Sequence, residues 1–371
     1  MIIDQNISSK GDFERFITKE SFKKIFILTG KNSYFKSGAA KLIGIYFKNK
    51  NTKFYFKINS IPEISELKDI TKNIKKFKPD LIVAVGGGSV MDYAKIANVM
   101  AQDAITNKSI INADYKLNKG FAKLAAIPTT AGSGAEVTAN AVIYINSKKY
   151  SVEGSSIKPD YFFLIPQLLL NSSKKLKASS GFDAISQAIE SIISTRSNKI
   201  SLKHAKLSLN LSSKNYLNFV KKKSLSASNK MSLAAYYSGE AISISKTTAP
   251  HAISYPFTSY FGISHGHAVS LTLEKFLKFN YLNKSKSTCN FDLEKRYNII
   301  FKILNVKNIF ELESFLKSLK RNAQLEQSFK TLKINLKDDF PKIAGGVNLL
   351  RLKNNPVPLS KKDLKKILTE Y

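Results

Sequence analysis

Short apolar runs alternate with amphipathic stretches through the first 165 residues of the chain. The runs at 24–30, 54–58, 80–88 and 123–130 are rich in Ile, Leu, Val, Phe and Ala, which is typical of buried strands. The segments at 39–49, 63–77 and 89–101 carry apolar residues at helical spacing. Because strands that alternate with helices pair in parallel, this region is predicted to form an α/β domain around a doubly wound, mostly parallel sheet.

The pattern changes after the apolar run at 161–170. The segments at 174–196, 200–222, 226–245 and 266–283 have helical periodicity, and few strand signals follow. We therefore predict an α/β domain over 1–165 and an all-α domain over 166–371. Within the first domain, 138–145 and 148–154 are expected to form a hairpin around Asn146, and a last helix is expected after an N-cap at Ser360.

Composition excludes some classes of protein. No apolar run approaches the roughly 18 residues of a membrane span, and the first residues do not resemble a signal peptide. The single cysteine, Cys289, fits a reducing cytoplasm. The net charge of +32 comes mostly from Lys spread along the chain, and no nucleic-acid module is recognisable, so no specific nucleic-acid binding is expected. A polyanion-binding protein without catalytic activity remains the alternative that this charge suggests.

A glycine turn follows the buried strand at 80–88. Gly86, Gly87, Gly88 and Ser89 link that strand to a helix for which Ser89 is placed as the cap. Glycine lets the backbone approach a ligand closely, and a helix N-terminus offers free N–H groups to an anion. The turn could serve packing alone, but its position after a strand favours a phosphate site.

A second loop, at 128–138, also follows a strand and contributes the hydroxyl groups of Thr129, Thr130 and Ser133. It could be a plain turn, yet two such loops at strand ends indicate a dinucleotide site. The first strand ends at Gly30, where an acidic residue would bind the ribose 2′-hydroxyl of NAD(H) and repel a 2′-phosphate. Since Gly30 carries no charge, we favour NADP(H) over NAD(H).

Histidine is rare and clustered: three of the four fall between 251 and 267. Asp183, His251 and His265 together offer a carboxylate and two imidazoles, a set that suits a catalytic metal and leaves room for a substrate oxygen. Gln187 lies four residues after Asp183, on the same helical face, and is a possible fourth ligand. The oxygen-rich set favours Fe²⁺, with Zn²⁺ as the alternative. Taken alone, Asp183 could instead serve only the first turn of a helix.

Five strings carry a resemblance to a known family: VAVGGGSVMDYAK, IPTTAGSGAEVT, GFDAISQAIES, HAISYPFTSYFGISHGHA and NPVPLSKKDL. In this order and spacing they are similar to the iron-containing alcohol dehydrogenase family. The resemblance implies a dinucleotide-binding α/β domain, an all-helical domain, metal-assisted hydride transfer and a possible homodimer. It further implies a pyrophosphate site at the glycine turn and Asp92, a cofactor lining of Thr129, Thr130 and Ser133, a nicotinamide-side position for Lys149, and metal ligands at Asp183, His251 and His265.

The chain departs from the family pattern at Gln187 and Tyr255, where histidines are usual. The strings around these positions resemble one branch of the family, the phosphonoacetaldehyde reductases, which implies reduction of phosphonoacetaldehyde to 2-hydroxyethylphosphonate. Tyr255 or His267 is the hypothesised proton route, with water as the alternative. Another iron-type dehydrogenase of unknown substrate and a cyclase like the dehydroquinate synthases are the competing enzymes. The expected anchors of a small anionic substrate are His267, Lys149, Arg196 and Arg351.

Overall fold

The computed structural model describes residues 9–103, 105–146, 148–347 and 349–370. Contacts between Cα atoms divide the chain into two compact units. The first contains the residues up to Thr130 and those from Gly134 to Ser172, and the second contains Ala131–Ser133 and the residues from Ser173 onward. The division thus follows Ser172 rather than Ile165, and three residues of the hydroxyl-rich loop group with the helical unit.

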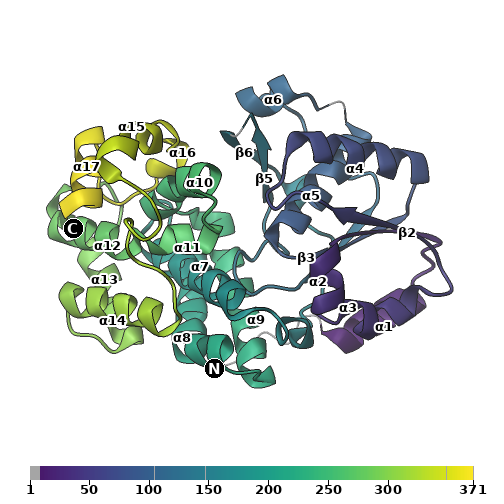
Figure 1. The fold of residues 1–371 in the computed structure, drawn as a ribbon, viewed down its shortest axis with the longest axis horizontal. Coiled ribbons are helices and arrows are strands. Elements are labelled where there is room, and N and C mark those ends of the chain that lie inside the picture. The colour runs from purple at the N-terminus through teal and green to yellow at the C-terminus, as the bar shows by residue number, and fades with distance from the viewer. Residues whose placement is uncertain (1–8, 104, 147, 348, 371) are drawn as a thin grey trace. The chain divides into compact units, whose positions relative to one another are not determined.

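A five-stranded parallel sheet forms the centre of the first unit (Figure 1). Its spatial order is β2-β1-β3-β4-β7. Helical segments connect β1, β2, β3 and β4 in turn, whereas a two-stranded hairpin lies between β4 and β7. The strands are β1 (Lys24–Gly30), β2 (Asn51–Lys57), β3 (Leu81–Gly86), β4 (Lys123–Pro128) and β7 (Tyr161–Phe162). The structure confirms the predicted α/β fold with its parallel sheet.

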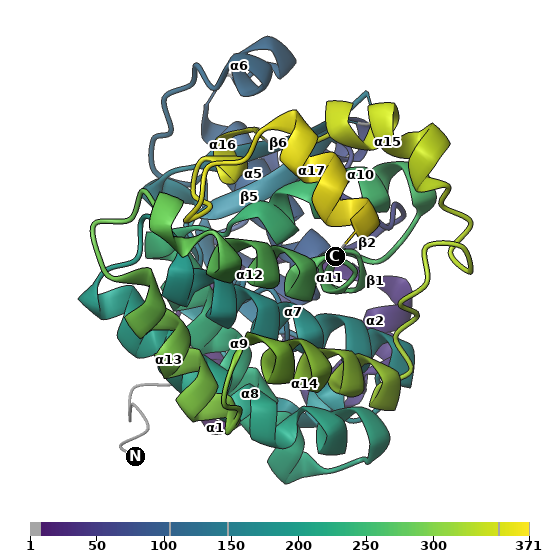
Figure 2. The same ribbon diagram turned by 90° about the vertical axis from the view of Figure 1, so that its left-hand side faces the viewer.

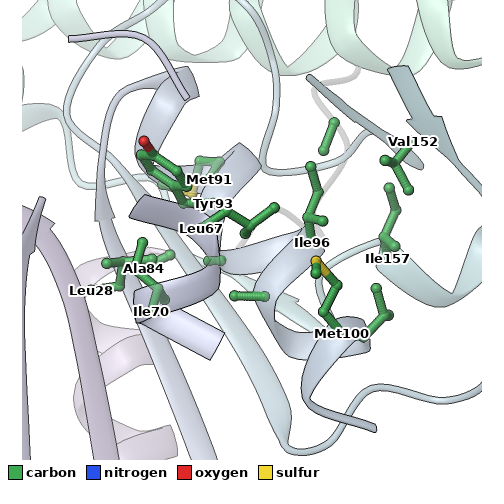
Figure 3. Close-up of a cluster of buried hydrophobic side chains, with 14 of the residues drawn as sticks. Leu28, Leu67, Ile70, Ala84, Met91, Tyr93, Ile96, Met100, Val152 and Ile157 are labelled. Atoms are coloured by element: carbon green, nitrogen blue, oxygen red, sulfur yellow. The ribbon is translucent and has the colours of Figure 1, made fainter. Parts of the chain in front are cut away.

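Alternate residues of the strands point to one face of this sheet, where two helices cover them. One of the helices is amphipathic and the other is buried along nearly its whole length. The helices are α4 (Ile64–Phe77) and α5 (Gly88–Gln102). Leu28 and Ala84 from the strands lie in one cluster with Leu67 and Ile70 from α4 and Ile96 from α5 (Figure 3). Each fully buried aliphatic side chain stabilises the fold by about 1.5–3 kcal/mol, so this layer holds α5 firmly on the sheet.

The remaining elements of the first unit are short. They are α1 (Lys10–Lys19), α2 (Lys31–Lys36), α3 (Ala39–Leu42), η1 (Gly44–Phe47), α6 (Asn107–Asn112), β5 (Asn140–Ile145), β6 (Lys148–Glu153), η2 (Ser155–Ile157) and η3 (Pro166–Leu169). The antiparallel pairing of β5 with β6 confirms the predicted hairpin, and Asn146 adopts a positive φ of 49° at its turn. The helix predicted over 39–49 instead breaks into α3 and η1 around Gly44, because glycine disfavours a helix interior.

The described residues of the second unit form helices, turns and loops only. The helices are α7 (Lys174–Ile193), α8 (Lys199–Lys221), α9 (Leu225–Ser245), α10 (Ala249–Phe261), α11 (His265–Ser270), α12 (Leu273–Leu282), η4 (Lys284–Lys286), α13 (Leu293–Leu304), α14 (Ile309–Asn322), α15 (Leu336–Gly345), α16 (Leu349–Leu352) and α17 (Lys361–Glu370). The helix predicted over 266–283 is interrupted at Thr272, which leaves helical geometry with φ −128° and ψ −10°.

Helix α7 is the central element of this unit (Figure 2). It packs against α8, α9, α11 and α13, so nearly all of its residues are buried. At the other end of the unit, the Ser360 hydroxyl accepts a hydrogen bond from the Asp363 N–H at 3.1 Å, which confirms the predicted cap of the last helix. Among the described residues, no helix combines the length and the apolar character needed to cross a bilayer.

Candidate functional site

Three polar side chains share one face of α7. The helix begins at Lys174, where the Ser173 side chain caps it, and Asp183 therefore lies in its middle. The alternative that Asp183 serves only a first helical turn is wrong. Gln187 follows Asp183 after four residues and Glu190 after seven, spacings that return to the same side of a helix. All three are buried, so α7 presents a polar stripe inside the unit.

The imidazoles reach this stripe from two shorter helices. Thr248 precedes α10, and Pro250 in the first turn suits a helix start, which places His251 near the beginning of α10. Gly262 ends α10 with a positive φ of 67°, a conformation that glycine adopts without strain. The chain then turns directly into α11, whose first residue is His265.

These segments bring Asp183, His251 and His265 together, with one potential ligand atom of each lying within 4.8 Å of the others. Nε2 of His251 lies 3.2 Å from Oδ1 of Asp183, and the two imidazole ring centroids are 5.3 Å apart. One carboxylate oxygen and two imidazole nitrogens suit Fe²⁺ or Zn²⁺. Three protein ligands also leave positions for a substrate or water, as a catalytic metal needs. The donor set therefore fits a divalent metal.

Gly266 makes this approach possible. A Cβ at this position would lie 2.1 Å from the Ser179 carbonyl oxygen and 2.8 Å from Cβ of Asp183. Any larger residue would force α11 away from α7. The glycine between two histidines is thus a packing requirement of the cluster.

The carboxylates and imidazoles of the cluster each favour the charged form of the other. Burial alone would lower the pKa of His251, but Glu190 and Asp183 outweigh it and raise that pKa to about 9. Burial alone would raise the pKa of Asp183, yet the hydrogen bond with His251 and the charges of His265 and His251 bring it below its usual value. Without a metal, the site is thus held as an ion pair, and a bound cation would take over the role of the imidazolium proton.

Gln187 is close to Asp183, but its amide is engaged on both sides. Its Nε2 lies 3.4 Å from Oδ2 of Asp183, while its Oε1 accepts a hydrogen bond from the Ser238 hydroxyl at 2.9 Å. In this orientation the amide faces Asp183 with its NH₂ group and supports the carboxylate. A role as a fourth metal ligand requires the amide to turn over, so that its oxygen points toward Asp183.

The two expected proton carriers lie in different places. Tyr255 is one helical turn after His251, and its ring centroid is 6.2 Å from that of His265. His267 lies two residues after His265 on α11, a spacing at which side chains do not share a helical face. Its Nε2 lies 2.7 Å from the Glu326 carbonyl oxygen, and burial lowers its pKa. The structure brings Tyr255 to the cluster and directs His267 elsewhere.

One residue in contact with the cluster escaped the sequence analysis. The carboxylate of Glu190 receives a hydrogen bond from Nδ1 of His251 and two more from the backbone N–H and the hydroxyl of Thr248, at 2.7 and 2.8 Å. Its exposed fraction is 0%. The sequence offered one signal, which is the spacing of seven residues from Asp183. That spacing places Glu190 on the same helical face as Asp183 and Gln187, and a buried carboxylate there needs a hydrogen-bond donor.

The glycine turn lies in the first unit, at the end of β3. Gly86 is the last residue of β3 and Gly87 is the N-cap of α5, so the prediction of Ser89 as the cap is wrong. Ser89 instead belongs to the first turn of α5, whose N–H groups lack acceptors within the helix. Thr129 N–H donates to the Gly86 carbonyl at 2.9 Å, and a Cβ on Gly87 would lie 3.2 Å from Oγ1 of Thr130.

The other expected cofactor residues flank this turn or lie on its loop. Asp92 is one turn into α5, where burial raises its pKa to about 6 against the charges of Lys95 and Lys149. Lys149 is on β6 and therefore acts on Asp92 from the hairpin. Gly30 ends β1. Ser133 belongs to the three residues of the loop that group with the helical unit. The backbone of this region is thus shaped for an anion, with mixed charges around it.

Comparison with protein families identifies both parts of the chain. Residues 7–166 match the family described as "Iron-containing alcohol dehydrogenase". Residues 177–371 match "Fe-containing alcohol dehydrogenase family, C-terminal".

Two characterised relatives show partial similarity. The phosphonoacetaldehyde reductase of Streptomyces viridochromogenes is 32% identical over 222 residues, which are 57% of this chain and 56% of that protein. The bifunctional aldehyde-alcohol dehydrogenase AdhE of Escherichia coli K12 is 30% identical over 281 residues, which are 71% of this chain and 31% of that protein. The chain therefore spans between about a third and about a half of the length of these relatives.

Solved structures share the whole fold. The sulfoacetaldehyde reductase of Bifidobacterium kashiwanohense, solved with NAD⁺, superposes with a TM-score of 0.86 at 24% identity and covers 99% of this chain and 98% of its own. A 1,3-propanediol oxidoreductase superposes with a TM-score of 0.87 at 20% identity, covering 98% and 97%. At these identities the structures establish the fold. The two family matches over residues 7–166 and 177–371 show that this chain belongs to the iron-containing alcohol dehydrogenase family.

Proposed function

We propose that the chain is a metal-dependent, NAD(P)H-linked reductase of a small aldehyde. The aldehyde carbon accepts a hydride from the nicotinamide, its oxygen accepts a proton, and the products are a primary alcohol and the oxidised nicotinamide. The observation that carries the proposal is the convergence of Asp183, His251 and His265, whose ligand atoms lie within 4.8 Å of one another.

The side chains of this centre have separate tasks in that reaction. A divalent metal held by Asp183, His251 and His265 would supply the Lewis acid that polarises the aldehyde oxygen. Asp183 provides the negative charge that retains the cation. In this proposal Tyr255, which follows His251 by one turn of α10, delivers the proton that the product oxygen requires. His267 is less suited, because its Nε2 is engaged by the Glu326 carbonyl.

Phosphonoacetaldehyde is the substrate that we favour. The support is the similarity to the Streptomyces viridochromogenes enzyme and the glutamine at position 187, where the family pattern has histidine. The phosphonate group of this substrate is an anion, and its binding requires a positively charged side chain. His267 is the least suited of the expected anchors because burial lowers its pKa.

The preference for NADP(H) has support at the end of β1. Gly30 is paired in register with Lys57 of β2, and neither residue carries a carboxylate. The Lys57 ammonium donates to the Asn59 carbonyl, and the Glu66 carboxylate acts on it electrostatically. A 2′-phosphate therefore meets no acidic side chain on Gly30 itself, and the 2′-hydroxyl of NAD(H) finds no carboxylate partner at that position.

An aldehyde panel tests the reaction. The full chain, loaded with Fe²⁺ or Zn²⁺, is given NADPH or NADH and followed at the absorbance of the reduced nicotinamide. We expect phosphonoacetaldehyde to be reduced faster than propionaldehyde, an uncharged control, with sulfoacetaldehyde as a second anion. Equal rates with propionaldehyde would contradict the substrate, and no oxidation of either nucleotide with any aldehyde would refute the reductase.

A pair of variants tests the nucleotide preference. Gly30→Asp should shift the ratio of NADPH to NADH efficiency toward NADH, because the new carboxylate repels a 2′-phosphate. Gly30→Ala is the matched control, since a Cβ here comes within 2.8 Å of the Ser33 hydroxyl whatever its charge. If both variants change the ratio equally, the charge argument fails.

A further inference from the structure

We propose that Glu190 is a positioning residue that selects Nε2 of His251 as the metal-binding nitrogen and fixes the helix start that carries it. This inference rests on the proposed metal site but concerns a residue outside its ligand set. Glu190 would act through His251 and Thr248 rather than by touching the metal.

The first argument is that both oxygens of Glu190 are already committed. Oε1 accepts from Nδ1 of His251, and Oε2 accepts from the N–H and the hydroxyl of Thr248. A carboxylate with an exposed fraction of 0% is costly unless donors surround it, and these three donors satisfy it. Glu190 is therefore a fixed acceptor and not a spare ligand.

The second argument concerns the imidazole tautomer. A neutral histidine carries one N–H, and a carboxylate beside Nδ1 keeps that proton on Nδ1. Nε2 then keeps its lone pair, and it faces Asp183 at 3.2 Å. Glu190 and Asp183, both on α7, thus face opposite nitrogens of the His251 ring. Only Nε2, the nitrogen beside Asp183, is left to bind a cation.

The third argument concerns the backbone. Thr248 is the N-cap of α10, yet its side chain makes no capping hydrogen bond to the helix. Its N–H and hydroxyl both turn to Glu190 instead. His251 lies in the first turn after this cap, so Glu190 holds the ring directly and the main chain that carries the ring.

Glu190→Gln is the discriminating variant because it keeps the shape and changes the donors. The two donors of Thr248 require the amide oxygen, which leaves the NH₂ group facing Nδ1. That NH₂ group favours the tautomer protonated on Nε2, whose lone pair is then lost to the metal. We expect a 10–100-fold loss in Zn²⁺ affinity by chelator competition. The visible spectrum of the Co²⁺-loaded protein should change as well.

Glu274→Gln is the matched control. Glu274 is likewise a buried glutamate of the helical unit, but it is paired with Lys320 and is not part of the cluster. This variant should lower the midpoint of thermal unfolding while leaving the Zn²⁺ affinity and the Co²⁺ spectrum unchanged. A general effect of losing a buried carboxylate would change both variants alike and overturn the proposal.

Thr248→Val decides the question if Glu190→Gln does not fold. It removes one of the three donors and should reduce Zn²⁺ affinity by roughly threefold to tenfold, less than Glu190→Gln. Unchanged metal affinity in every folded variant would overturn the proposal, as would a wild-type chain that binds neither Zn²⁺ nor Co²⁺. Metal binding is measured without aldehyde or nucleotide, so a wild-type chain that binds metal but reduces no aldehyde would refute the proposed function alone.

Discussion

The glycine turn of the first unit and the metal centre of the second both suit a charged ligand, but they are built by opposite means. The turn consists of consecutive residues, Gly86 to Ser89, whose value lies in having little or no side chain. The centre draws its side chains from α7, α10 and α11, and each is held by a further contact. We therefore expect the glycine turn to be disrupted by substitutions that add a side chain. We expect the metal centre to be disrupted by substitutions that remove one.

The largest effect should come from Asp183→Ala. Without this carboxylate the centre loses the one anionic ligand of its set, and we expect no retained metal and a fall in kcat/KM on the order of 10³-fold. Metal content by elemental analysis and steady-state rates check this. Nucleotide binding, measured by fluorescence titration, should not change, and a parallel loss there would show that the two regions are not independent.

Gly266→Ala tests the close approach of α11 to α7. The added Cβ would meet the Ser179 carbonyl oxygen at 2.1 Å, so the helices must separate. We expect a loss of about 1–3 kcal/mol or more in the free energy of unfolding and weaker metal binding. Gly345→Ala is the control, because nothing lies within 4 Å of a Cβ there. Equal behaviour of the two variants in chemical denaturation would contradict the packing argument.

Gly86→Ala is the corresponding change in the turn. Its Cβ would lie 2.5 Å from Cγ2 of Val90, which must move together with the first turn of α5. The expected cost is about 1–3 kcal/mol in stability, with weaker nucleotide binding and unchanged metal affinity. Gly11→Ala, whose Cβ would meet only the Ser9 hydroxyl at 3.8 Å, should bind nucleotide normally. Reduced metal affinity in Gly86→Ala, with normal affinity in Gly11→Ala, would show that a change in the turn also affects the metal centre.

Gln187→His should affect the centre in the opposite direction. A third imidazole beside Asp183 replaces a neutral amide, and we expect Fe²⁺ or Zn²⁺ affinity to rise about tenfold, or about 1.4 kcal/mol. Chelator competition measures the change. A loss of affinity would mean that the contacts of Gln187 with Ser238 and Asp183 matter more than an added ligand.

The smallest effect should be the pH dependence that Asp92 adds to stability. Its pKa is about 6 in the fold against the ordinary value of 3.8, so the folded chain holds this proton more tightly than the unfolded chain. The contribution is present below about pH 4 and is lost as the pH rises through 6, because a carboxyl with a raised pKa favours folding only while it is protonated. Urea titrations of Asp92→Asn should lack this slope. A variant that keeps it would assign the slope to another group.

The sequence predicted the parts of this molecule that depend on local pattern. Alternating apolar runs predicted β1, β3 and β4, and clustered histidines pointed to His251 and His265. The sequence did not predict features that depend on contacts between distant parts of the chain. Nothing local shows that Thr272 interrupts a helix or that Gln187 turns its oxygen to Ser238. Glu190 was missed because its partners are 58 and 61 residues away, and only the fold reveals which imidazole needs it.

Helix α7 limits how the metal centre can adapt to ions of different size. Asp183 and Glu190 are separated by two turns of a rigid rod, about 10 Å along its axis. No replacement within the rod can alter that interval. Any adjustment to a smaller or larger ion must therefore come from the short connections before α10 and α11. These connections can move His251 and His265 relative to α7, whose own residues stay in place.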